Sequence, residues 1–180
     1  MKPLAIVGNG PTRDNPRHNN MGWDVWAMNN HPFLWQKRVT ALFEMHPDAL
    51  DADRYTAEYK DWLKRVTFPV YMHRVHPDIP SSVQFPREAI AQEFPMHLEK
   101  GVKPLHNFFA ETTAYMLALA LYYRYQIIEL YGIDLNKRQY LPHRDSIFFW
   151  LGYLQANRVR VIIPEESPLM DEALYPFNHK

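Results

Sequence analysis

The sequence predicts a single α/β domain: a mostly parallel sheet with helices on both faces and a small lid or insertion. Two observations lead to this prediction. Several short, continuous apolar runs are typical of strands buried on both faces, and two long apolar segments between the later runs are typical of crossover helices. The chain has 180 residues, 47% of them hydrophobic and 22% charged, which suits one domain with a substantial core.

The strands are predicted from apolar runs that stop at glycine, asparagine, proline or a charged residue. Such runs are too short for buried helices and lack the alternation of half-exposed strands. Parallel strands covered on both faces read in this way. The predicted strands are Leu4–Val7, Asp24–Met28, Val39–Met45, Ile127–Tyr131 and Val159–Ile163, with Pro69–Met72 as a sixth.

Two helices are predicted from longer apolar segments. Thr112–Tyr123 is apolar almost all round, which indicates a helix buried against the sheet. Ser146–Asn157 is similar, and Asp145 is placed to cap it. Tyr55–Arg65 is a weaker, amphipathic candidate.

Residues 73–108 differ from the rest of the chain. Five prolines break any periodicity there, so we expect a lid-like insertion around 73–108 that orders when a ligand binds. Residues 1–180 as a whole are then one nucleotide-binding domain. The His73/His76 pair within the insertion is interpreted as loop histidines, because no carboxylate stands at a recognised metal-ligand spacing.

Charge and composition exclude several classes of partner. Twenty basic residues balance twenty acidic ones, so no overall field favours nucleic acid or an anionic membrane. There is no cysteine, which excludes disulfides, zinc–thiolate sites and a thiol nucleophile. No apolar run suits a membrane span or a signal peptide, so a cytoplasmic location is expected. Association with further copies of the chain is left open.

The segment Gly8–Thr12 (Gly-Asn-Gly-Pro-Thr) is the sharpest candidate site. It follows the first predicted strand, where the strand's carboxyl end faces the ligand crevice of a doubly wound sheet. Gly8 and Gly10 permit positive φ, and the N–H groups of such a turn, with Asn9 between them, can bind phosphate. The alternative is an ordinary turn, because Gly, Asn and Pro are common in turns.

Polar residues also follow other predicted strands at the same edge of the sheet. Asn29 can pair with a base or a ribose. Asp134 ends the strand that closes with Gly-Ile-Asp and is a further nucleotide-binding candidate. The segment Glu44–His46 would line this edge as well. Each of these residues has a plainer interpretation as a turn residue or a solvated strand end.

The starts of the two long helices carry the remaining candidates. Thr112 stands where unsatisfied N–H groups and the helix dipole attract an anion, although a threonine there is often just a cap. His143 precedes the second helix, where an imidazole can act as a general acid or base. Tyr140 can donate a hydrogen bond to phosphate. The alternative for His143 is a surface histidine in a polar loop.

Several segments, in the same order along the chain, resemble the bacterial lipooligosaccharide-type α-sialyltransferases. That family shares its fold with a wider group of Rossmann-like proteins, including archaeal hydroxymethylpterin pyrophosphokinase relatives. The resemblance lies outside residues 46–108. The matching segments are Leu4–Thr12, Asp24–Asn29, Thr112–Ala120, Ile128–Asp134, His143 with the helix and strand that follow it, and Pro164–Leu169.

The resemblance implies a single Rossmann-like domain that uses a cytidine monophosphate sugar as donor and needs no metal. It implies that the turn at Gly8, Asn9 and Gly10, with Asn29 and Thr112, holds the nucleotide. Tyr140 would contact the phosphate, and His143 would be the general base on the acceptor hydroxyl. No resident cofactor is implied, because the nucleotide sugar is itself the substrate.

Two departures from the family pattern bear on the donor. Asn136 stands where the family has the first of two phosphate-binding tyrosines, and Phe109 stands where a basic residue would meet a carboxylated sugar. Two alternatives therefore stay open. One is a Mg²⁺-dependent pyrophosphokinase relative using Glu44, Glu111 and Asp134; the other is a non-catalytic nucleotide-binding or sensing module.

Overall fold

The protein is built on one seven-stranded sheet in which every neighbouring pair of strands is parallel. A computed structural model describes residues 2–14, 16–47, 50, 55–95, 99–100, 103–104, 109–135 and 141–170. The strand order is β5-β4-β3-β2-β1-β8-β9. The strands are β1 (Leu4–Val7), β2 (Asp24–Met28), β3 (Ala41–Phe43), β4 (Val70–Met72), β5 (Ser82–Gln84), β8 (Ile127–Tyr131) and β9 (Arg160–Ile162).

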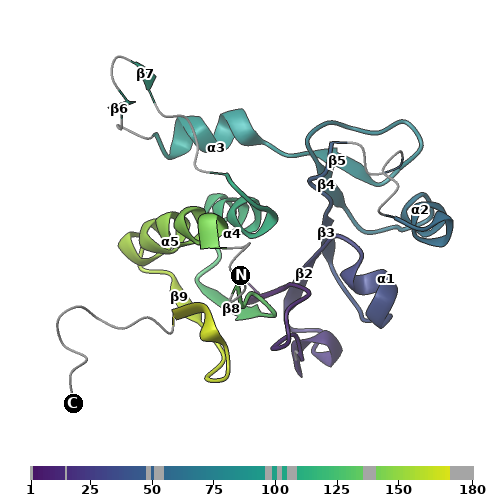
Figure 1. Ribbon diagram of the computed structural model, residues 1–180, viewed down its shortest axis with the longest axis horizontal. Coiled ribbons are helices and arrows are strands. Elements are labelled where there is room, and N and C mark those ends of the chain that lie inside the picture. Colours follow the sequence, from purple (N-terminus) through teal and green to yellow (C-terminus); the bar gives the residue numbers. More distant parts are fainter. Residues whose placement is uncertain are drawn as a thin grey trace.

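Helices cover both faces of the sheet, as predicted (Figure 1). The helices α4 and α5 lie side by side on one face, and α1 and α2 lie beyond the other face near β3 and β4. The bounds are α1 (His31–Trp35), α2 (Ala57–Leu63), α3 (Arg87–Glu93), α4 (Thr112–Tyr122) and α5 (Leu141–Ala156), with short 3₁₀ helices at Pro16–Asn19 and Pro168–Met170.

Along the central strands, successive side chains point to opposite faces of the sheet and pack in separate cores. Leu4 and Ile6 of β1 pack in the core beneath α4 and α5, whereas Ala5 and Val7 pack on the opposite face. All four are fully buried, which explains the continuous apolar run in the sequence. Helix α4 is buried from Thr113 to Leu121 because it lies between the sheet and α5.

The start of the second long helix differs most from the sequence prediction. Helix α5 begins at Leu141, so Asp145 lies inside the helix and does not cap it. The His143 carbonyl instead accepts a hydrogen bond from Ser146 Oγ within the first turns. The first turn of α5 has the polar sequence of a loop, because it lies at the rim of the sheet, where a helix does not need an apolar face.

The region around 73–108 contributes to the main sheet as well as lying beside it. Strand β5 pairs with β4, and α3 packs on α4. Two short strands, β6 (Glu99–Lys100) and β7 (Lys103–Pro104), form an antiparallel pair. The expected ordering of this region when a ligand binds stays a prediction.

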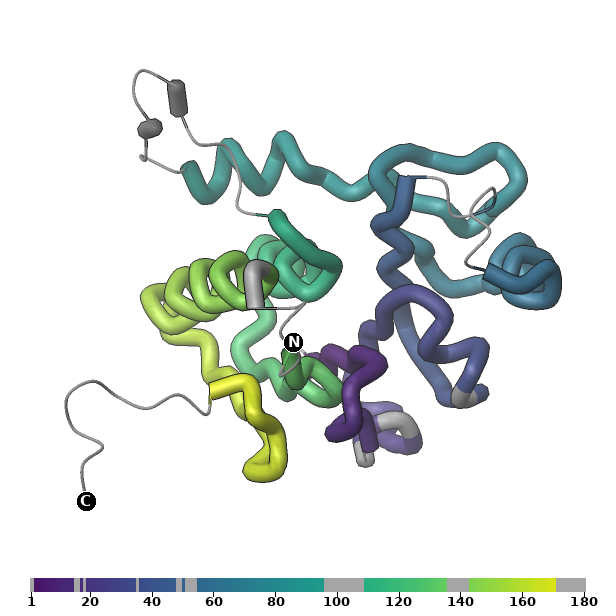
Figure 2. Tube along the Cα trace, viewed as in Figure 1, coloured from purple at the N-terminus to yellow at the C-terminus, as the bar shows by residue number. Residues whose placement is uncertain are grey.

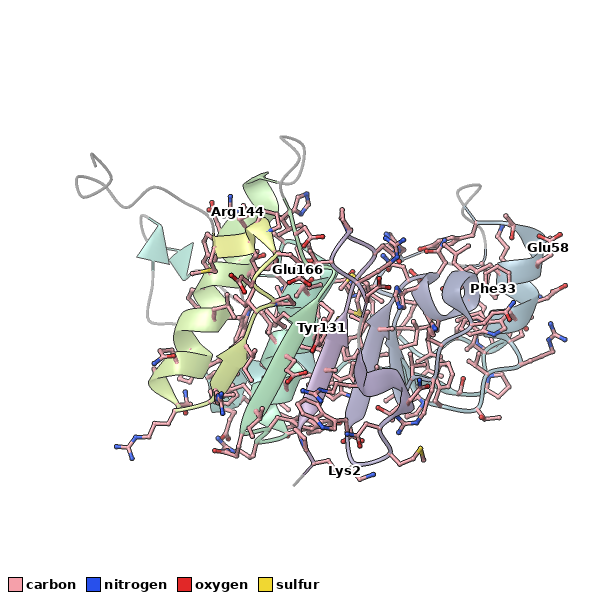
Figure 3. All side chains as sticks on the ribbon, turned by 90° about the horizontal axis from the view of Figure 1, so that it is seen from below. Lys2, Phe33, Glu58, Tyr131, Arg144 and Glu166 are labelled. Carbon is pink, nitrogen blue, oxygen red and sulfur yellow. The ribbon has the colours of Figure 1, made fainter. Side chains whose placement is uncertain are left out.

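The chain reverses direction across the sheet between β1 and β8. From β1 it builds β2, β3, β4 and β5 outward on one side, then returns through α4 to form β8 and β9 on the other (Figure 2). Ligands of open α/β sheets bind outside the carboxyl ends of the strands at such a switch point. In Figure 3, Lys2, ahead of β1, lies at one edge of the sheet, and Arg144, early in α5, lies at the opposite, carboxyl edge.

The turn after β1 is fastened to the loop after β8 at this switch point. Gly8 N donates to Tyr131 O at 2.8 Å, and Gly10 N donates to Gly132 O at 2.9 Å. A Cβ on Gly10 would lie 2.7 Å from Gly132 O and would overlap the Asp134 carboxylate. Gly132 has the positive φ, at 63°, whereas Gly8 and Gly10 do not. The two glycines of the turn are therefore required for close packing against the β8 loop, not for the left-handed backbone expected from the sequence.

We predict that Gly10→Ala destabilises the fold by about 1–3 kcal/mol, because the added methyl group overpacks the contact between the two loops. The matched control is Gly152→Ala in α5, where a Cβ meets nothing within 4 Å. Alanine there should be neutral or stabilise by up to about 1 kcal/mol. Thermal or urea unfolding measures both variants. A Gly10→Ala protein as stable as the wild type would contradict the packing role.

Candidate functional site

A cavity of about 630 Å³ opens at the carboxyl edge of the sheet. Its wall is made by the residues that follow β1, β2, β3, β4 and β8, together with the starts of α4 and α5. The cavity is of the size that holds small ligands and cofactors. Gly8 lies outside its wall, and Tyr140 lies outside the described residues. Six residues nominated from the sequence line it: Asn9, Gly10, Asn29, Thr112, Asp134 and His143.

The turn after β1 offers fewer donors than the sequence suggested. The N–H groups of Gly8 and Gly10 are bonded to the β8 loop, and Thr12 N donates to Asp134 Oδ2 at 3.1 Å. Pro11 has no N–H. The backbone N–H of Asn9 thus remains as the donor of this turn that a ligand can use, since the described part of the chain provides no acceptor for it. The expected cradle of several N–H groups is not present.

The side chain of Asn9 joins the turn after β1 to the end of β2. Its Oδ1 lies 3.3 Å from Nδ1 of the buried His31, and its Nδ2 donates to Asn30 Oδ1 at 3.4 Å. These contacts fix the floor of the cavity between β1 and β2. Asn9 therefore positions the backbone of the turn and leaves its side-chain groups engaged within the protein.

Asn29 lines the cavity and has an unpaired side-chain acceptor. Its backbone has a φ of 53°, and its N–H donates to Phe43 O at 2.9 Å, which holds the residue at the end of β2. Within the described residues, its side-chain Oδ1 is buried and contacts no hydrogen-bond donor. Buried polar atoms are nearly always paired. The unpaired amide oxygen, in a residue that lines the cavity, makes Asn29 a candidate for contact with a ligand.

Asp134 is engaged by the protein itself. Its carboxylate accepts hydrogen bonds from Thr12 Oγ1 at 2.5 Å, from Thr12 N, and from Ser167 Oγ at 3.3 Å. The residue is buried, with 3% of its surface exposed. Asp134 thus ties the β1 turn and the C-terminal segment to the end of β8. Its contribution to the site is the shape of the cavity wall.

The amino end of α4 is capped by the protein's own carboxylate. Glu111 accepts hydrogen bonds from Thr113 N at 2.7 Å and from Ala114 N at 2.6 Å. Burial raises the pKa of the Glu111 carboxyl. The hydrogen bonds from these amides oppose that rise, and so does the electrostatic effect of the neighbouring His143 ring. The sequence suggested that an anionic ligand would bind these amides, but Glu111 already satisfies them.

His143 reaches the cavity from the first turn of α5. Its Nδ1 lies 3.0 Å from the carbonyl oxygen of Ala110, just ahead of α4. A carbonyl oxygen only accepts, so Nδ1 carries the proton, and Nε2 has the lone pair in the neutral ring. This tautomer is the one that a general base acting through Nε2 requires.

Sequence reasoning undervalued the wall of the cavity on the β3 and β4 side. His46 follows β3 and His73 follows β4, and both line the cavity together with Met28 and Met45. The sequence had placed the segment Glu44–His46 at this edge, with solvation of the strand end as the plainer interpretation. A buried carboxylate beside His46 would have favoured a functional role for this histidine. The burial of Glu44 cannot be predicted from its position in the sequence.

An aromatic stack forms the back of the cavity. Phe109 stacks on Tyr115 with ring centroids 4.4 Å apart and on Trp150 with centroids 5.3 Å apart. Phe109 and Tyr115 line the cavity, so this wall is apolar and rigid. The ring of Phe109 therefore has a packing role at the position where the resembled family would have a basic residue.

The described residues were also compared with the requirements of a metal site and of a membrane span. In this part of the chain, no group of three or more histidine, aspartate or glutamate side chains is placed to hold a metal ion. None of the helices described is both long and apolar enough to cross a membrane.

Solved structures with the same fold include several of a bacterial sialyltransferase. The CstII sialyltransferase of Campylobacter jejuni with CMP has a TM-score of 0.54 and 17% sequence identity, over 91% of this chain and 79% of that chain. Its complex with the substrate analogue CMP-3FNeuAc gives 0.56 and 18%, over 91% and 80%. A complex of the CST-II sialyltransferase with a trisaccharide acceptor and CMP gives 0.55 and 16%, over 90% and 80%.

No protein-family model matches the chain, and no curated protein sequence matches it. At 16–18% identity, the similarity to the solved structures shows the fold. The chain therefore has a sialyltransferase-like α/β fold, and its cavity lies at the carboxyl edge of the parallel sheet.

Proposed function

We propose that the protein binds a nucleotide sugar in the cavity and transfers the glycosyl group to a hydroxyl acceptor. The observation that carries this proposal is the unpaired Oδ1 of Asn29, buried in the wall of a cavity that His143 also lines. Solved proteins of the same fold contain CMP or a CMP-sugar analogue, which supports a nucleotide-type ligand. Each further assignment below is part of the proposal.

The nucleotide is held by few, well-placed groups. Asn9 N–H and Thr112 provide donors near the phosphate, Asn29 Oδ1 accepts from the ligand, and Tyr140 donates to the phosphate. The apolar wall formed by Phe109 and Tyr115 excludes water from one side of the ligand.

The transfer step needs one general base. Nε2 of His143 takes the proton from the acceptor hydroxyl as the hydroxyl oxygen forms a bond to the anomeric carbon. The bond from that carbon to the phosphate oxygen breaks, and its electron pair leaves with the nucleotide. The Ala110 carbonyl holds His143 in the tautomer that this step uses.

Glu111 favours a donor whose sugar is uncharged. Its carboxylate lies in the cavity wall at the amino end of α4, so it repels a second carboxylate and already accepts from the amides of Thr113 and Ala114. The aromatic ring of Phe109 adds no positive charge on this side. We therefore place nucleotide sugars with neutral sugars ahead of carboxylated ones.

The hydrogen bonds that the cavity carboxylates already accept bear on the two alternative functions. A magnesium-dependent pyrophosphokinase would need the carboxylates of Glu44, Glu111 and Asp134, yet each of them accepts hydrogen bonds from protein donors. A non-catalytic nucleotide-binding module remains the second candidate, because the turn after β1 has lost most of its free donors.

Calorimetric titration tests the proposed function. The ligands are CMP, UMP, AMP and GMP, then CMP-3FNeuAc, UDP-N-acetylglucosamine and GDP-mannose, each with and without Mg²⁺. We expect saturable, magnesium-independent binding of at least one nucleotide and its sugar conjugate. Binding that requires Mg²⁺ favours the pyrophosphokinase alternative. No binding by any of these ligands would contradict the proposal.

We predict that His143→Asn lowers turnover of the bound nucleotide sugar by on the order of 10²–10⁴-fold, the usual contribution of a positioned acid–base group. Affinity for the parent nucleotide should stay nearly constant, because the imidazole serves the acceptor. The control is His76→Asn, outside the cavity wall. Equal rates for wild type and His143→Asn would remove His143 from the mechanism.

We also predict that Glu111→Gln improves binding of CMP-3FNeuAc relative to CMP by roughly two- to fivefold, the effect of one charge at a helix end. Glutamine keeps an oxygen that can accept from the α4 amides, so the fold should be retained. Competition titration of the two ligands measures the ratio. An unchanged ratio in a folded variant would show that Glu111 does not discriminate against carboxylated sugars.

A further inference from the structure

A carboxylate lies fully buried beside the cavity, directly after β3. Glu44 has 0% of its surface exposed. Tyr59 Oη donates to Oε2 at 2.8 Å, and Tyr55 Oη donates to Oε1 at 3.3 Å. His46 Nδ1 lies 2.5 Å from the same Oε1. Tyrosines from the α2 side and the imidazole from the end of β3 thus saturate this carboxylate.

Such a buried carboxylate is costly unless every acceptor site is satisfied. Burial, together with the charge of Glu44, raises the pKa of Tyr59, which keeps its hydroxyl protonated as a donor. An apolar residue at this place would avoid the cost of desolvating a charge. A role in orienting His46 accounts for a carboxylate at this position.

Glu44 fixes the orientation and the tautomer of His46. The carboxylate accepts, so Nδ1 carries the proton, and Nε2 is the acceptor nitrogen of the neutral ring. The ring lines the cavity, and 27% of its side chain is exposed. Within the described residues, Nε2 contacts no hydrogen-bond partner. His46 therefore offers a fixed acceptor to a ligand.

His46 and His143 serve different parts of the cavity. His46 follows β3, whereas His143 lies in the first turn of α5 with its ring against the Ala110 carbonyl ahead of α4. An acceptor nitrogen beside a buried carboxylate disfavours phosphate oxygens and suits a neutral donor. The hydroxyl groups of a sugar are such donors.

We propose that His46 is a specificity-determining residue whose Nε2 accepts a hydrogen bond from a hydroxyl of the glycosyl group, with Glu44 as its positioning residue. This inference rests on the proposed nucleotide-sugar function. It places the nucleotide at the end of β1 and the sugar toward the ends of β3 and β4.

The test compares each nucleotide sugar with its parent nucleotide in wild type and in His46→Asn. Asparagine keeps an amide nitrogen that can donate to Glu44 but has no atom at the position of Nε2. The ligand pairs are CMP with CMP-3FNeuAc, UDP with UDP-N-acetylglucosamine, and GDP with GDP-mannose. For the pair that wild type binds best, we expect His46→Asn to weaken binding of the sugar conjugate about three- to tenfold. The affinity for the parent nucleotide should not change.

Three results would overturn the inference. An unchanged affinity for the conjugate shows that His46 does not contact the sugar, and leaves the proposed function intact. Equal losses for nucleotide and conjugate place His46 at the nucleotide instead. Binding of none of the six ligands by wild type removes the proposed function and this inference together. His76→Asn, outside the cavity wall, is the matched control and should bind all ligands as wild type does.

The role of Glu44 has its own readout in ¹⁵N NMR of the imidazole rings. In wild type we expect His46 to show a protonated Nδ1 and an unprotonated Nε2 in neutral solution. In Glu44→Gln we expect a mixture of the two tautomers, because an amide can either donate to Nδ1 or accept from it. A wild-type His46 with the proton on Nε2, or an unchanged tautomer in Glu44→Gln, would contradict the positioning role.

Discussion

The hydrogen bonds between the turn after β1 and the loop after β8 determine where a ligand can bind. Gly8 and Gly10 donate to the carbonyls of Tyr131 and Gly132, which holds the two central strand ends together at the switch point of the sheet. Asp134 adds its bonds to Thr12. Because this junction is fixed, the cavity opens above it, between the sheet edge and the start of α4. The donors consumed in building the junction are also the donors that a phosphate would otherwise find there.

The electrostatics of the cavity depend on which charged side chains in its wall are already hydrogen-bonded within the protein. Glu111 accepts from the amides of Thr113 and Ala114, and Asp134 is satisfied by hydroxyl and backbone donors. The cavity wall is also lined by uncharged polar groups, among them the side chains of Asn29 and Thr112 and the imidazole of His46. Such a set recognises hydroxyl and amine donors better than it recognises several negative charges, which is the physical reason for favouring a neutral glycosyl group.

The sequence predicted the fold well where burial alone determines the residue pattern. Continuous apolar runs identified six of the strands, most clearly the central β1, β2 and β8, whose inner residues are buried on both faces. Strand β5 was missed because it is short and mostly exposed at the sheet edge, which leaves no apolar run. Side-chain roles at the site were harder to predict. The engagement of Asp134 by Thr12, like the burial of Glu44, depends on contacts between residues distant in sequence or on a different element.

A crystal structure of the protein with CMP tests the central claim most directly. We expect the nucleotide at the switch point, between the turn after β1 and the start of α4, with one of its donor groups within hydrogen-bond distance of Asn29 Oδ1. We also expect open space on the His46 side of the cavity, where a sugar would continue from the phosphate. A nucleotide bound elsewhere on the surface, or at the switch point with Asn29 Oδ1 still unpaired, would contradict the account.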